Sequence, residues 1–371
     1  MKSINRIVLS GGGTGGHIYP ALALYRRLKS LNPDLEVLYI GTQRGLESKI
    51  VPKEGLSFQA VEISGIKRSL SLDNFKVLIQ MFSSTGKAQK LIKSFKPDVV
   101  LGTGGYVCGP VLLAAALAKF PTVIHEQNSV AGVTNKFLAR FVDRIATCFP
   151  EAKAQFGRFQ NKVQMIGNPR GQEVVLTNNE TGILSRQFNL QDQKRTILIF
   201  GGSRGAPAIN KAGLESVDHW LLADYQVILA MGQEHYNDLE PKEVDNLNTS
   251  PNLRIVPYID NMPSVFRAID LVICRAGATT LTELTALGLP SILIPSPYVT
   301  ANHQEHNALS LVNQGAALMI KENELTTETL IQAVEKLMDQ PELLEEMSMQ
   351  AKKIGIVDAS DRLINMMQDI I

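Results

Sequence analysis

The feature that most constrains the fold is a glycine-rich segment that follows a short apolar run and occurs once in each half of the chain. The first segment, GGGTGGH, extends from Gly11 to His17, and the second, GGSRGA, extends from Gly201 to Ala206. Each has the pattern of a turn between a strand and a helix, which leaves backbone N–H groups free at the start of the helix. We therefore expect two α/β units, each with a loop that can hold an anion.

Short runs of strand type alternate with helical segments along the whole chain. Alternation of this kind predicts parallel sheets, and the runs fall into two series. The first series comprises 6–9, 37–40, 99–101, 122–124 and 144–147, and the second comprises 196–200, 227–230, 254–256, 271–273 and 291–294. The expected fold class is α/β, with two similar units in tandem.

The segment GNPRG at 167–171 has the composition of a domain junction, because Pro169 lacks a backbone donor and disfavours a helix at Asn168. We expect an N-terminal domain at 1–168 and a C-terminal domain at 169–371. The pattern does not say on which domain the last helix, at about 355–371, packs. Packing against the N-terminal domain is one of the two alternatives.

Composition argues against several protein classes. The chain has 371 residues, enough for a sizeable core, and no apolar run approaches the roughly 18 residues of a membrane-spanning helix. Its N-terminus lacks the pattern of a secretory signal, so we expect the protein to stay inside the cell. Three widely spaced cysteines, Cys108, Cys148 and Cys274, indicate neither a disulfide framework nor a zinc site. We expect no metal and no cofactor.

The charge is divided unevenly along the chain. Residues 1–170 carry 23 Lys and Arg against 10 Asp and Glu, whereas residues 171–371 carry 14 against 26. Clustered Lys and Arg are attracted to anionic lipid by about 1 kcal/mol each, so the two halves are expected to meet different partners. The alternative is simply two solvated surfaces of opposite charge.

Two common anion-binding classes fit the glycine loops poorly. An NAD-dependent oxidoreductase needs an acidic residue at the end of its second strand, whereas the run 37–40 ends in Gly41, Thr42 and Gln43. A P-loop enzyme needs Lys and then Ser or Thr after its glycines, and GGGTGGHI has neither. Two more glycine-containing loops follow strands, GTGGYVCGP at 102–110 and CRAGATTLTE at 274–283.

Together these motifs resemble the MurG family of glycosyltransferases, and the resemblance extends over nearly the whole chain. The residues that carry it are GGGTGGH, GGY at 104–106, HEQN at 125–128, GNP at 167–169, GGSRGA, CRAGATTLTE and Gln304. The resemblance implies the GT-B fold, in which two Rossmann-like domains face a central cleft. It also implies an inverting, metal-independent transfer of N-acetylglucosamine (GlcNAc) from UDP-GlcNAc. The acceptor would be the C4 hydroxyl of the N-acetylmuramic acid (MurNAc) pentapeptide of undecaprenyl-diphosphate lipid I, and the product lipid II of peptidoglycan synthesis.

The same resemblance implies where such a protein acts and what it meets. Its partners would be UDP-GlcNAc, the undecaprenyl-diphosphate-linked MurNAc-pentapeptide, an anionic membrane surface and other enzymes of cell-wall synthesis. It would sit peripherally on the cytoplasmic face of the cell membrane and serve cell shape and division. Nucleic acid is not an expected partner.

By resemblance, the substrate-binding residues are spread over both halves. They are Thr14, Gly15, Gly16, Tyr106, Asn128, Arg170, Ser203, Ile259, Ala278, Thr279, Thr280, Leu281, Thr282, Glu283 and Gln304. Ser203 would bind a phosphate oxygen, Glu283 the two ribose hydroxyls and the Ile259 backbone the uracil edge. Gln304 offers a donor and an acceptor to sugar hydroxyls. Arg170 departs from many relatives, which have one more residue between Pro and Arg.

Inverting sugar transfer needs a base near the acceptor hydroxyl and donors for the departing diphosphate. His17, directly after the glycines, is the candidate base, and Glu126 is the reserve candidate. His17 could equally orient a phosphate or the acceptor, and the sequence does not rank the two residues. No DxD-type motif for a metal is evident. Tyr106, Glu126, Gln127 and Asn135 are placed by resemblance where the acceptor would enter.

A segment near residue 80 has the pattern of a face that docks on a membrane. Its apolar residues Leu72, Phe75, Ile79 and Phe82 keep helical spacing, and Lys76 lies among them. Between 67 and 96 there are seven Lys and Arg and one acidic residue, Asp73. The alternative is a core-facing stripe with solvated lysines. The uneven charge and a lipid acceptor favour docking.

Two other functions remain open at this stage. A UDP-sugar 2-epimerase of GT-B fold would share the nucleotide-binding loops but would need acid and base carboxylates and no lipid face. A non-catalytic, membrane-bound UDP-sugar sensor would keep the loops and need no base.

Overall fold

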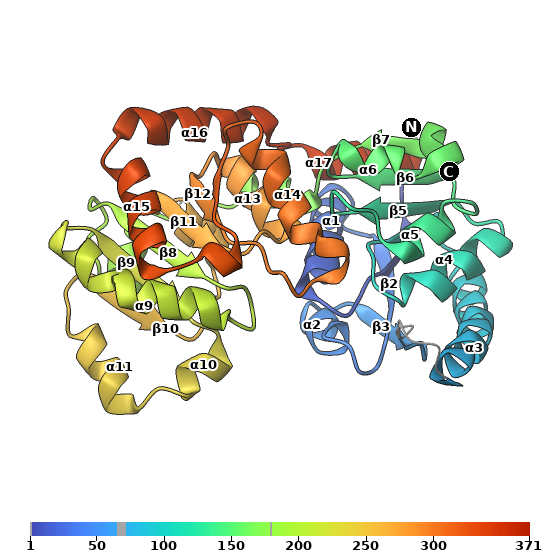
Figure 1. The fold of residues 1–371 in the computed structure, drawn as a ribbon. Helices are drawn as coiled ribbons and strands as arrows, with labels where there is room; N and C mark the ends of the chain where they lie inside the picture. The colour runs from blue at the N-terminus through green and yellow to red at the C-terminus, as the bar shows by residue number, and fades with distance from the viewer. Residues whose placement is uncertain (1, 65–71, 179) are drawn as a thin grey trace. The chain divides into compact units, whose positions relative to one another are not determined.

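The computed structural model describes residues 2–64, 72–178 and 180–371, and for residues 72–78 and 243 it describes the backbone alone. The chain forms two compact units, which are coloured along the sequence in Figure 1. Unit 1 comprises Met1–Glu173 and Asp358–Ile371, and unit 2 comprises Val174–Val357. In the described ranges, no helix is long and apolar enough to cross a membrane.

The described part of unit 1 is built on a parallel sheet of seven strands in the order β3-β2-β1-β4-β5-β6-β7. Ile7 and Leu9 of β1 join one hydrophobic core and Val8 joins another, because successive residues of a strand point to opposite faces. Helices therefore cover both faces, as a parallel sheet requires. The strands are β1 Arg6–Ser10, β2 Glu36–Gly41, β3 Ser57–Ala60, β4 Val99–Gly102, β5 Thr122–Glu126, β6 Arg144–Thr147 and β7 Val163–Met165.

The helices of unit 1 divide between those two cores. Ile18 and Leu22 of α1 pack on one face together with Leu363 of α17, and Ile92 of α3 and Leu112 of α4 pack on the other. The helices are α1 Gly15–Leu31, α2 Glu47–Lys53, α3 Leu72–Phe95, α4 Cys108–Leu117, α5 Val133–Leu138, α6 Glu151–Ala154 and α17 Ala359–Gln368, with the 3-10 helix η1 Gly157–Lys162. Helix α7 Pro169–Leu176 begins in unit 1 and ends in unit 2.

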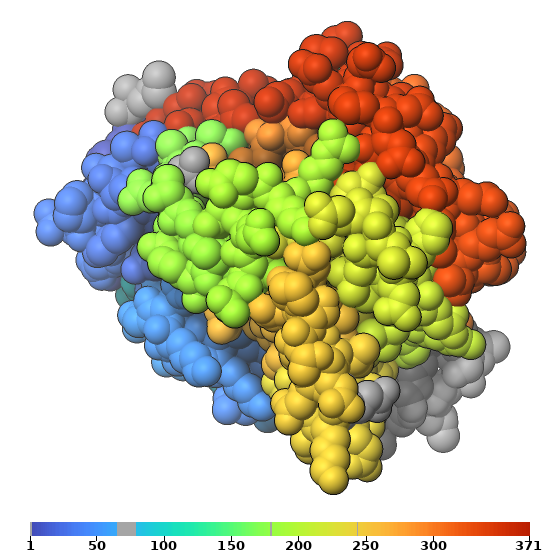
Figure 2. All heavy atoms as spheres, turned by 90° about the vertical axis from the view of Figure 1, so that its left-hand side faces the viewer, coloured from blue at the N-terminus to red at the C-terminus, as the bar shows by residue number. Residues whose placement is uncertain are grey.

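The described part of unit 2 is also built on a parallel sheet, with six strands in the order β10-β9-β8-β11-β12-β13. The strands are β8 Thr196–Phe200, β9 Gln226–Ala230, β10 Leu253–Val256, β11 Leu271–Cys274, β12 Ser291–Leu293 and β13 Leu318–Met319. The helices are α8 Ile183–Phe188, α9 Pro207–Leu222, α10 Gln233–Asn237, α11 Pro241–Asn248, α12 Met262–Phe266, α13 Ala278–Leu287, α14 His303–Val312, α15 Thr327–Met338 and α16 Pro341–Ile354, with η2 Thr300–Asn302 and η3 Glu322–Glu324. The segment of α10 and α11 projects from the surface of unit 2, in yellow in Figure 2. Two parallel α/β units confirm the expected fold class.

The division of the chain differs slightly from the expected 1–168 and 169–371. Unit 1 continues through Glu173, and the chain returns to it at Asp358. The returning helix α17 buries Leu363, Ile364, Met366 and Met367 in the core that contains α1. Asp361 accepts two hydrogen bonds from Arg27, at 2.7 and 3.1 Å.

Each sheet has one point where the strand order reverses direction. In unit 1 this switch point lies between β1 and β4, and in unit 2 between β8 and β11. Ligands of open α/β sheets bind outside the carboxyl ends of the strands at such points. The loops that follow these strands are the four glycine-containing segments at 11–17, 102–110, 201–206 and 274–283.

Candidate active site

The two glycine loops of unit 1 touch each other at its switch point. Gly12 N–H donates to Gly104 O at 3.2 Å. Gly104 has a φ of +113°, and a Cβ built there would lie 2.6 Å from Cδ2 of His17. Gly105 has a φ of +86°, and its Cβ would lie 2.4 Å from Gly12 O. Only glycine allows both the left-handed backbone and this close approach.

The His17 imidazole lies against Gly104 and is half-buried. Its Nδ1 is 2.9 Å from Gly12 O. Because a carbonyl oxygen can only accept, this contact requires a proton on Nδ1 and leaves Nε2 of the neutral ring as an acceptor. The backbone is fixed as well, since Thr103 Oγ1 donates to His17 O at 2.6 Å.

Glu126, at the end of β5, is buried and holds a loop together. Its Oε1 accepts from Asn128 N–H at 3.0 Å. Its Oε2 accepts from Gly132 N–H and from Asn135 Nδ2, both at 2.8 Å. With both oxygens engaged, the carboxylate shapes the loop after β5.

His125 and Gln127 tie three segments together behind the loops. His125 Nε2 lies 2.9 Å from Gly167 O, and Gln127 Nε2 lies 2.9 Å from His125 Nδ1 and donates to Thr103 O at 2.6 Å. Burial lowers the pKa of His125, which keeps the ring neutral. The network connects the GNP segment at 167–169 to the residue that holds the His17 backbone.

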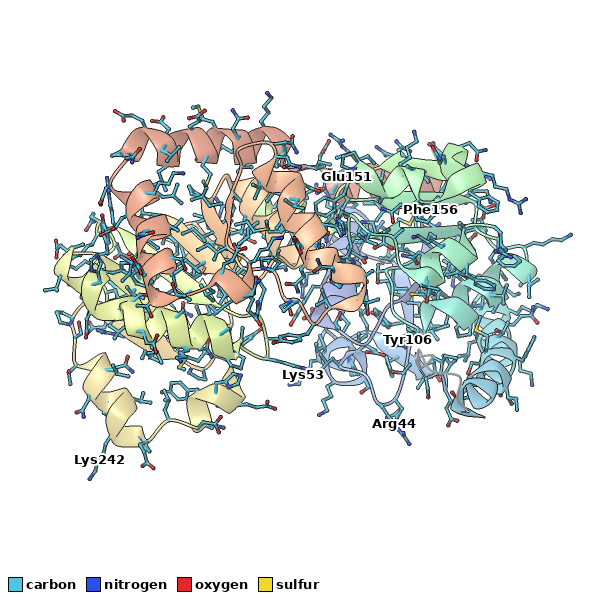
Figure 3. The ribbon with its side chains drawn as sticks, in the orientation of Figure 1. Arg44, Lys53, Tyr106, Glu151, Phe156 and Lys242 are labelled. Atoms are coloured by element: carbon cyan, nitrogen blue, oxygen red, sulfur yellow. The ribbon has the colours of Figure 1, made fainter. Side chains whose placement is uncertain are left out.

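The other expected residues of unit 1 lie around this point with different surroundings. Thr14 is exposed and precedes α1, which Gly15 and Gly16 open. Tyr106 is 60% exposed just before α4 (Figure 3). Arg170, expected in the second domain, lies in unit 1, where its guanidinium pairs with Glu173 and stands 5.7 Å from the Tyr19 ring centre.

In unit 2, the loop after β8 is pressed against the residues that follow β9. A Cβ on Gly205, whose φ is +74°, would lie 1.9 Å from Met231 O. Gly205 N–H donates to Gly202 O at 2.9 Å and closes the turn before α9. Ser203 is exposed at the tip of this turn.

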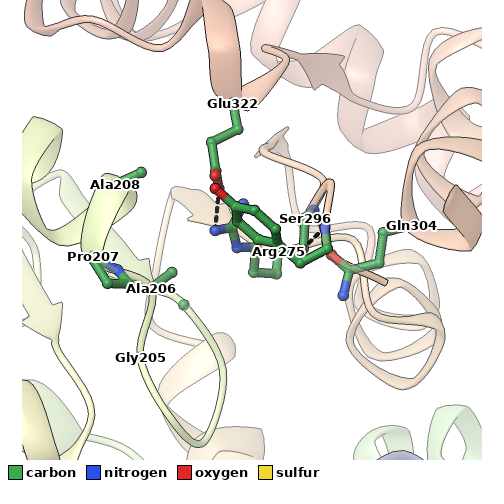
Figure 4. Close-up of a pocket in the computed structure, with 10 residues that line it drawn as sticks. Gly205, Ala206, Pro207, Ala208, Arg275, Ser296, Gln304 and Glu322 are labelled. Carbon is green, nitrogen blue, oxygen red and sulfur yellow. Dashed lines mark hydrogen bonds and ion pairs between the residues drawn. The ribbon is translucent and has the colours of Figure 1, made fainter. Parts of the chain in front are cut away.

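A pocket of about 390 Å³ opens beside this loop. In Figure 4, Ala206 and Pro207 lie on one side of the pocket, and Ser296 and Gln304 lie on the other. The lining residues are Gly201, Gly205, Ala206, Pro207, Ala208, Arg275, Ser296, Tyr298, Gln304 and Glu322. The pocket therefore collects the carboxyl ends of β8, β11 and β12.

Of the residues expected from the sequence, Gln304 lines this pocket. Its Oε1 accepts from Ser296 N–H at 2.9 Å, which leaves the Nε2 amide group without a partner among the described residues. Arg275 also lines the pocket, pairs with Glu322 and donates to Ile294 O at 3.1 Å. Sequence reasoning missed both members of this ion pair, although Arg275 belongs to the CRAGATTLTE motif.

The remaining expected residues of unit 2 do not line the pocket. Ile259 and Glu283 are buried, and Glu283 lies on α13, one turn after Ala278. The other members of the α13 stretch are Thr279, Thr280, Leu281 and Thr282, of which Leu281 is buried. In the residues that the structure describes, no three His, Cys, Asp or Glu gather as a metal site would require.

Comparison with known proteins shows the family of the chain. The model of the glycosyltransferase family 28 N-terminal domain matches residues 7–147, and the model of the family 28 C-terminal domain matches residues 196–363. A protein of Bacillus cytotoxicus is 51% identical over 365 residues, covering 98% of this chain and 99% of the relative. It is named UDP-N-acetylglucosamine--N-acetylmuramyl-(pentapeptide) pyrophosphoryl-undecaprenol N-acetylglucosamine transferase.

Solved structures show the same architecture. The crystal structure of Acinetobacter baumannii MurG is 29% identical, with a TM-score of 0.74 over 98% of this chain and 99% of that one. A UDP-GlcNAc 2-epimerase of Neisseria meningitidis is 16% identical, with a TM-score of 0.67 over 98% of this chain and 99% of that one, and shows the fold alone.

The two family models, the paired sheets and the loops at both switch points define a glycosyltransferase of the GT-B fold. Within this class, the relative that is 51% identical over 98% of this chain gives a narrower assignment. The chain belongs to the MurG family.

Proposed function

We propose that the protein transfers GlcNAc from UDP-GlcNAc to the C4 hydroxyl of the MurNAc-pentapeptide of undecaprenyl-diphosphate lipid I, with inversion, and so produces lipid II for peptidoglycan synthesis. The observation that carries this proposal is the His17 ring, held at the switch point of unit 1 with Nε2 as its acceptor nitrogen. A relative that shares 51% of its residues over 98% of this chain bears the name of this transferase.

In this proposal, unit 2 binds the donor. The turn at 201–206 and the start of α9 present backbone N–H groups and Ser203 to the diphosphate. The free amide of Gln304 faces the sugar hydroxyls, and Glu283 and the Ile259 backbone hold ribose and uracil. The stretch 278–283 opens α13 beside them. Because backbone donors stabilise the departing UDP, the transfer needs no metal.

Unit 1 binds the acceptor and activates it. Nε2 of His17 takes the proton from the C4 hydroxyl as its oxygen attacks C1 of GlcNAc and the C1–O bond to UDP breaks. Tyr106 lies on the loop after β4 and contacts the acceptor, whereas Asn128, on the loop after β5, binds UDP-GlcNAc. Thr14, Gly15 and Gly16, at the start of α1, bind the diphosphate of UDP-GlcNAc. Arg170, which lies in unit 1, also binds UDP-GlcNAc in this proposal.

The membrane-docking face is built by α3, α4 and α5 of unit 1, which lie side by side in Figure 1. Phe82 is 79% exposed, Ile79 is 56% exposed and Val133 is 79% exposed. Gly109, in the first turn of α4, brings α3 and α5 together: a Cβ on it would lie 3.5 Å from Met81 Cε and 3.7 Å from Thr134 Cγ2. Met81 precedes Phe82 in α3, and Thr134 follows Val133 in α5. The side chains of Leu72, Phe75 and Lys76 lie outside the described ones.

This face is close to the acceptor loop within the same unit. Gly109 follows Tyr106 by three residues, and the same loop includes Gly104, which contacts His17. A lipid-linked acceptor anchored at α3 and α5 could therefore present its headgroup to His17. We place the protein peripherally on the cytoplasmic face of the cell membrane, with anionic lipid and other wall-synthesis enzymes as its partners.

The proposal is tested by transfer of labelled GlcNAc from UDP-GlcNAc to a short-chain lipid I analogue, with EDTA present. We expect a labelled disaccharide-lipid from the wild type. We expect His17→Gln to lose about 10²–10⁴-fold in kcat, the range that a general base contributes, while UDP-GlcNAc binding by calorimetry is retained. Binding without any transfer by the wild type would support the sensor, and release of a 2-epimerised sugar would support the epimerase.

A further inference from the structure

Glu47, the first residue of α2, is an acidic side chain with no exposed surface. Three glycines leave room for it: a Cβ on Gly12 or Gly45 would lie 2.4 or 2.1 Å from its carboxylate oxygens, and one on Gly41 would lie 2.6 Å from its Cγ. Burying a carboxylate is unfavourable unless donors surround it. The packing shows that the chain is built around this group.

Both oxygens of Glu47 accept hydrogen bonds from fixed donors. Oε1 accepts from Thr42 N–H at 2.9 Å and from Thr42 Oγ1 at 2.7 Å. Oε2 accepts from Gly13 N–H at 2.9 Å. Glu47 therefore holds a backbone N–H of the first glycine loop, a group of the kind that binds a ligand anion in other α/β proteins.

The bond to Gly13 leads directly to His17. Gly13 N–H and Gly12 C=O belong to one peptide group. Gly12 O accepts the hydrogen bond from His17 Nδ1–H, with 2.9 Å between Nδ1 and the oxygen. One side of that planar group thus faces Glu47 and the other faces the imidazole. Hydrogen bonds in such a chain polarise one another, so a carboxylate at one end strengthens the acceptor at the other.

We propose that Glu47 is a positioning residue for His17, acting through the Gly12–Gly13 peptide group. It fixes the peptide plane, holds the proton on Nδ1 of His17 and so keeps Nε2 available to the acceptor hydroxyl. This inference rests on the proposed role of His17 as the base. It gives unit 1 a carboxylate–peptide–imidazole chain in place of a direct carboxylate–imidazole pair.

Two side chains beside the loop, those of Tyr39 and Cys108, are neutral. Tyr39 donates to Gly11 O at 2.7 Å, and burial raises its pKa well above the ordinary value. Burial likewise raises the pKa of the Cys108 thiol, beside Ser10 and Gly104, to about 12. Arg170 of α7 stands over the ring of Tyr19 of α1 and is paired with Glu173. Glu47 is a charged group that is hydrogen-bonded to this loop, through Gly13 N–H.

The test is a double-mutant cycle on transfer kinetics with Glu47→Gln, His17→Gln and the double variant. An amide has one acceptor oxygen, so Glu47→Gln must leave an NH2 group facing either Thr42 N–H or Gly13 N–H. We expect Glu47→Gln to lose about 10- to 100-fold in kcat, within the range of general-base catalysis, with KM for UDP-GlcNAc changed less than about twofold. In the His17→Gln background the same change should cost little further, because coupled residues are not additive.

The control is Ser48→Ala, in the same turn of α2, which removes the 2.8 Å bond from Ser48 Oγ to Gly45 O and leaves Glu47 untouched. Its kcat should stay within about twofold of wild type. Equal losses from Glu47→Gln in both backgrounds would reduce Glu47 to a structural role and overturn the inference. An inactive His17→Gln beside a fully active Glu47→Gln would overturn it as well and leave the proposed function standing, whereas a fully active His17→Gln would remove the base assignment itself.

A second measurement needs no Glu47 variant. Nitrogen NMR of the histidine rings distinguishes the two neutral tautomers, and the His17 signals are assigned by their absence from His17→Gln. We expect the wild-type ring to carry its proton on Nδ1. A proton on Nε2 in the neutral ring would contradict the relay.

Discussion

At the scale of single residues, Gly104 decides whether His17 can occupy its place. Its φ of +113° lies where side chains are disfavoured, and an added Cβ would stand 2.6 Å from the ring. We expect Gly104→Ala to displace the imidazole and to lose at least about 100-fold in kcat, as removal of a general base does. Binding of UDP-GlcNAc, measured by calorimetry, should be unchanged because we propose that unit 2 binds the donor.

The matched control for this substitution is Gly86→Ala in α3. A Cβ on Gly86 meets nothing within 4 Å, and its φ is ordinary. Alanine is favoured over glycine in a helix by about 1 kcal/mol, so this variant should be as active as wild type and slightly more stable. Equal activity of the two alanine variants would show that the Gly104 contact does not position His17.

Sequence patterns predict a functional residue when its neighbours in the sequence form a recognisable motif. The glycines beside His17 stand in a recognisable run after an apolar strand. Glu47 and Glu322 do not, because an acid at the start of a short helix or 3-10 turn has the pattern of a solvated residue, and only the fold buries the one and pairs the other with Arg275. The sequence does not rank His17 against Glu126, and our proposal of His17 as the base rests on the hydrogen bonds that each side chain makes.

At the scale of elements, the exposed apolar side chains of α3 and α5 contribute favourable burial free energy only when another surface covers them. Burial of a Phe or Val side chain stabilises by about 1.5–3 kcal/mol. We expect Phe82→Ser and Val133→Ser each to weaken binding to phosphatidylglycerol vesicles by about tenfold or more, measured by sedimentation. Transfer to a short-chain, water-soluble acceptor should persist in both variants.

A suitable control for vesicle binding is Leu222→Ser. Leu222 is 89% exposed at the end of α9 in unit 2. The substitution therefore removes a similarly exposed apolar side chain from a different surface. Its vesicle binding should match wild type. A similar loss in all three variants would indicate unspecific hydrophobic adsorption and would argue against a docking face on unit 1.

Elements were predictable where their environment was simple. The central strands are continuous apolar runs because both faces are covered, and the sequence placed them well. The strands β3, β7 and β13 were not predicted, because each lies at a sheet edge with partly exposed residues and is only four, three or two residues long. Pro169, taken as a junction, instead begins α7, where its missing N–H is tolerated. Arg170 consequently lies in unit 1.

At the scale of the whole molecule, unit 1 is assembled from two separated parts of the chain. Residues 358–371 return from unit 2 and complete its core. Besides Arg27, the side chain of Gln172 donates to Asp361 at 2.7 Å, so the returning helix is fixed by polar and apolar contacts. Unit 2, by contrast, is one continuous segment, and it should fold without the C-terminus.

This difference predicts the outcome of a truncation after Val357. The deletion removes four buried side chains of α17, Leu363, Ile364, Met366 and Met367, each worth about 1.5–3 kcal/mol, a sum comparable to the roughly 5–15 kcal/mol of a whole domain. Unit 1 should therefore be unfolded at 37 °C, and its cooperative unfolding transition should be missing from the far-UV circular dichroism melt. The single tryptophan, Trp220, is buried in unit 2, so its fluorescence should show a nearly unchanged transition. Loss of both signals together would mean that unit 2 depends on unit 1, whereas an intact far-UV transition would mean that α17 is dispensable to the core it completes.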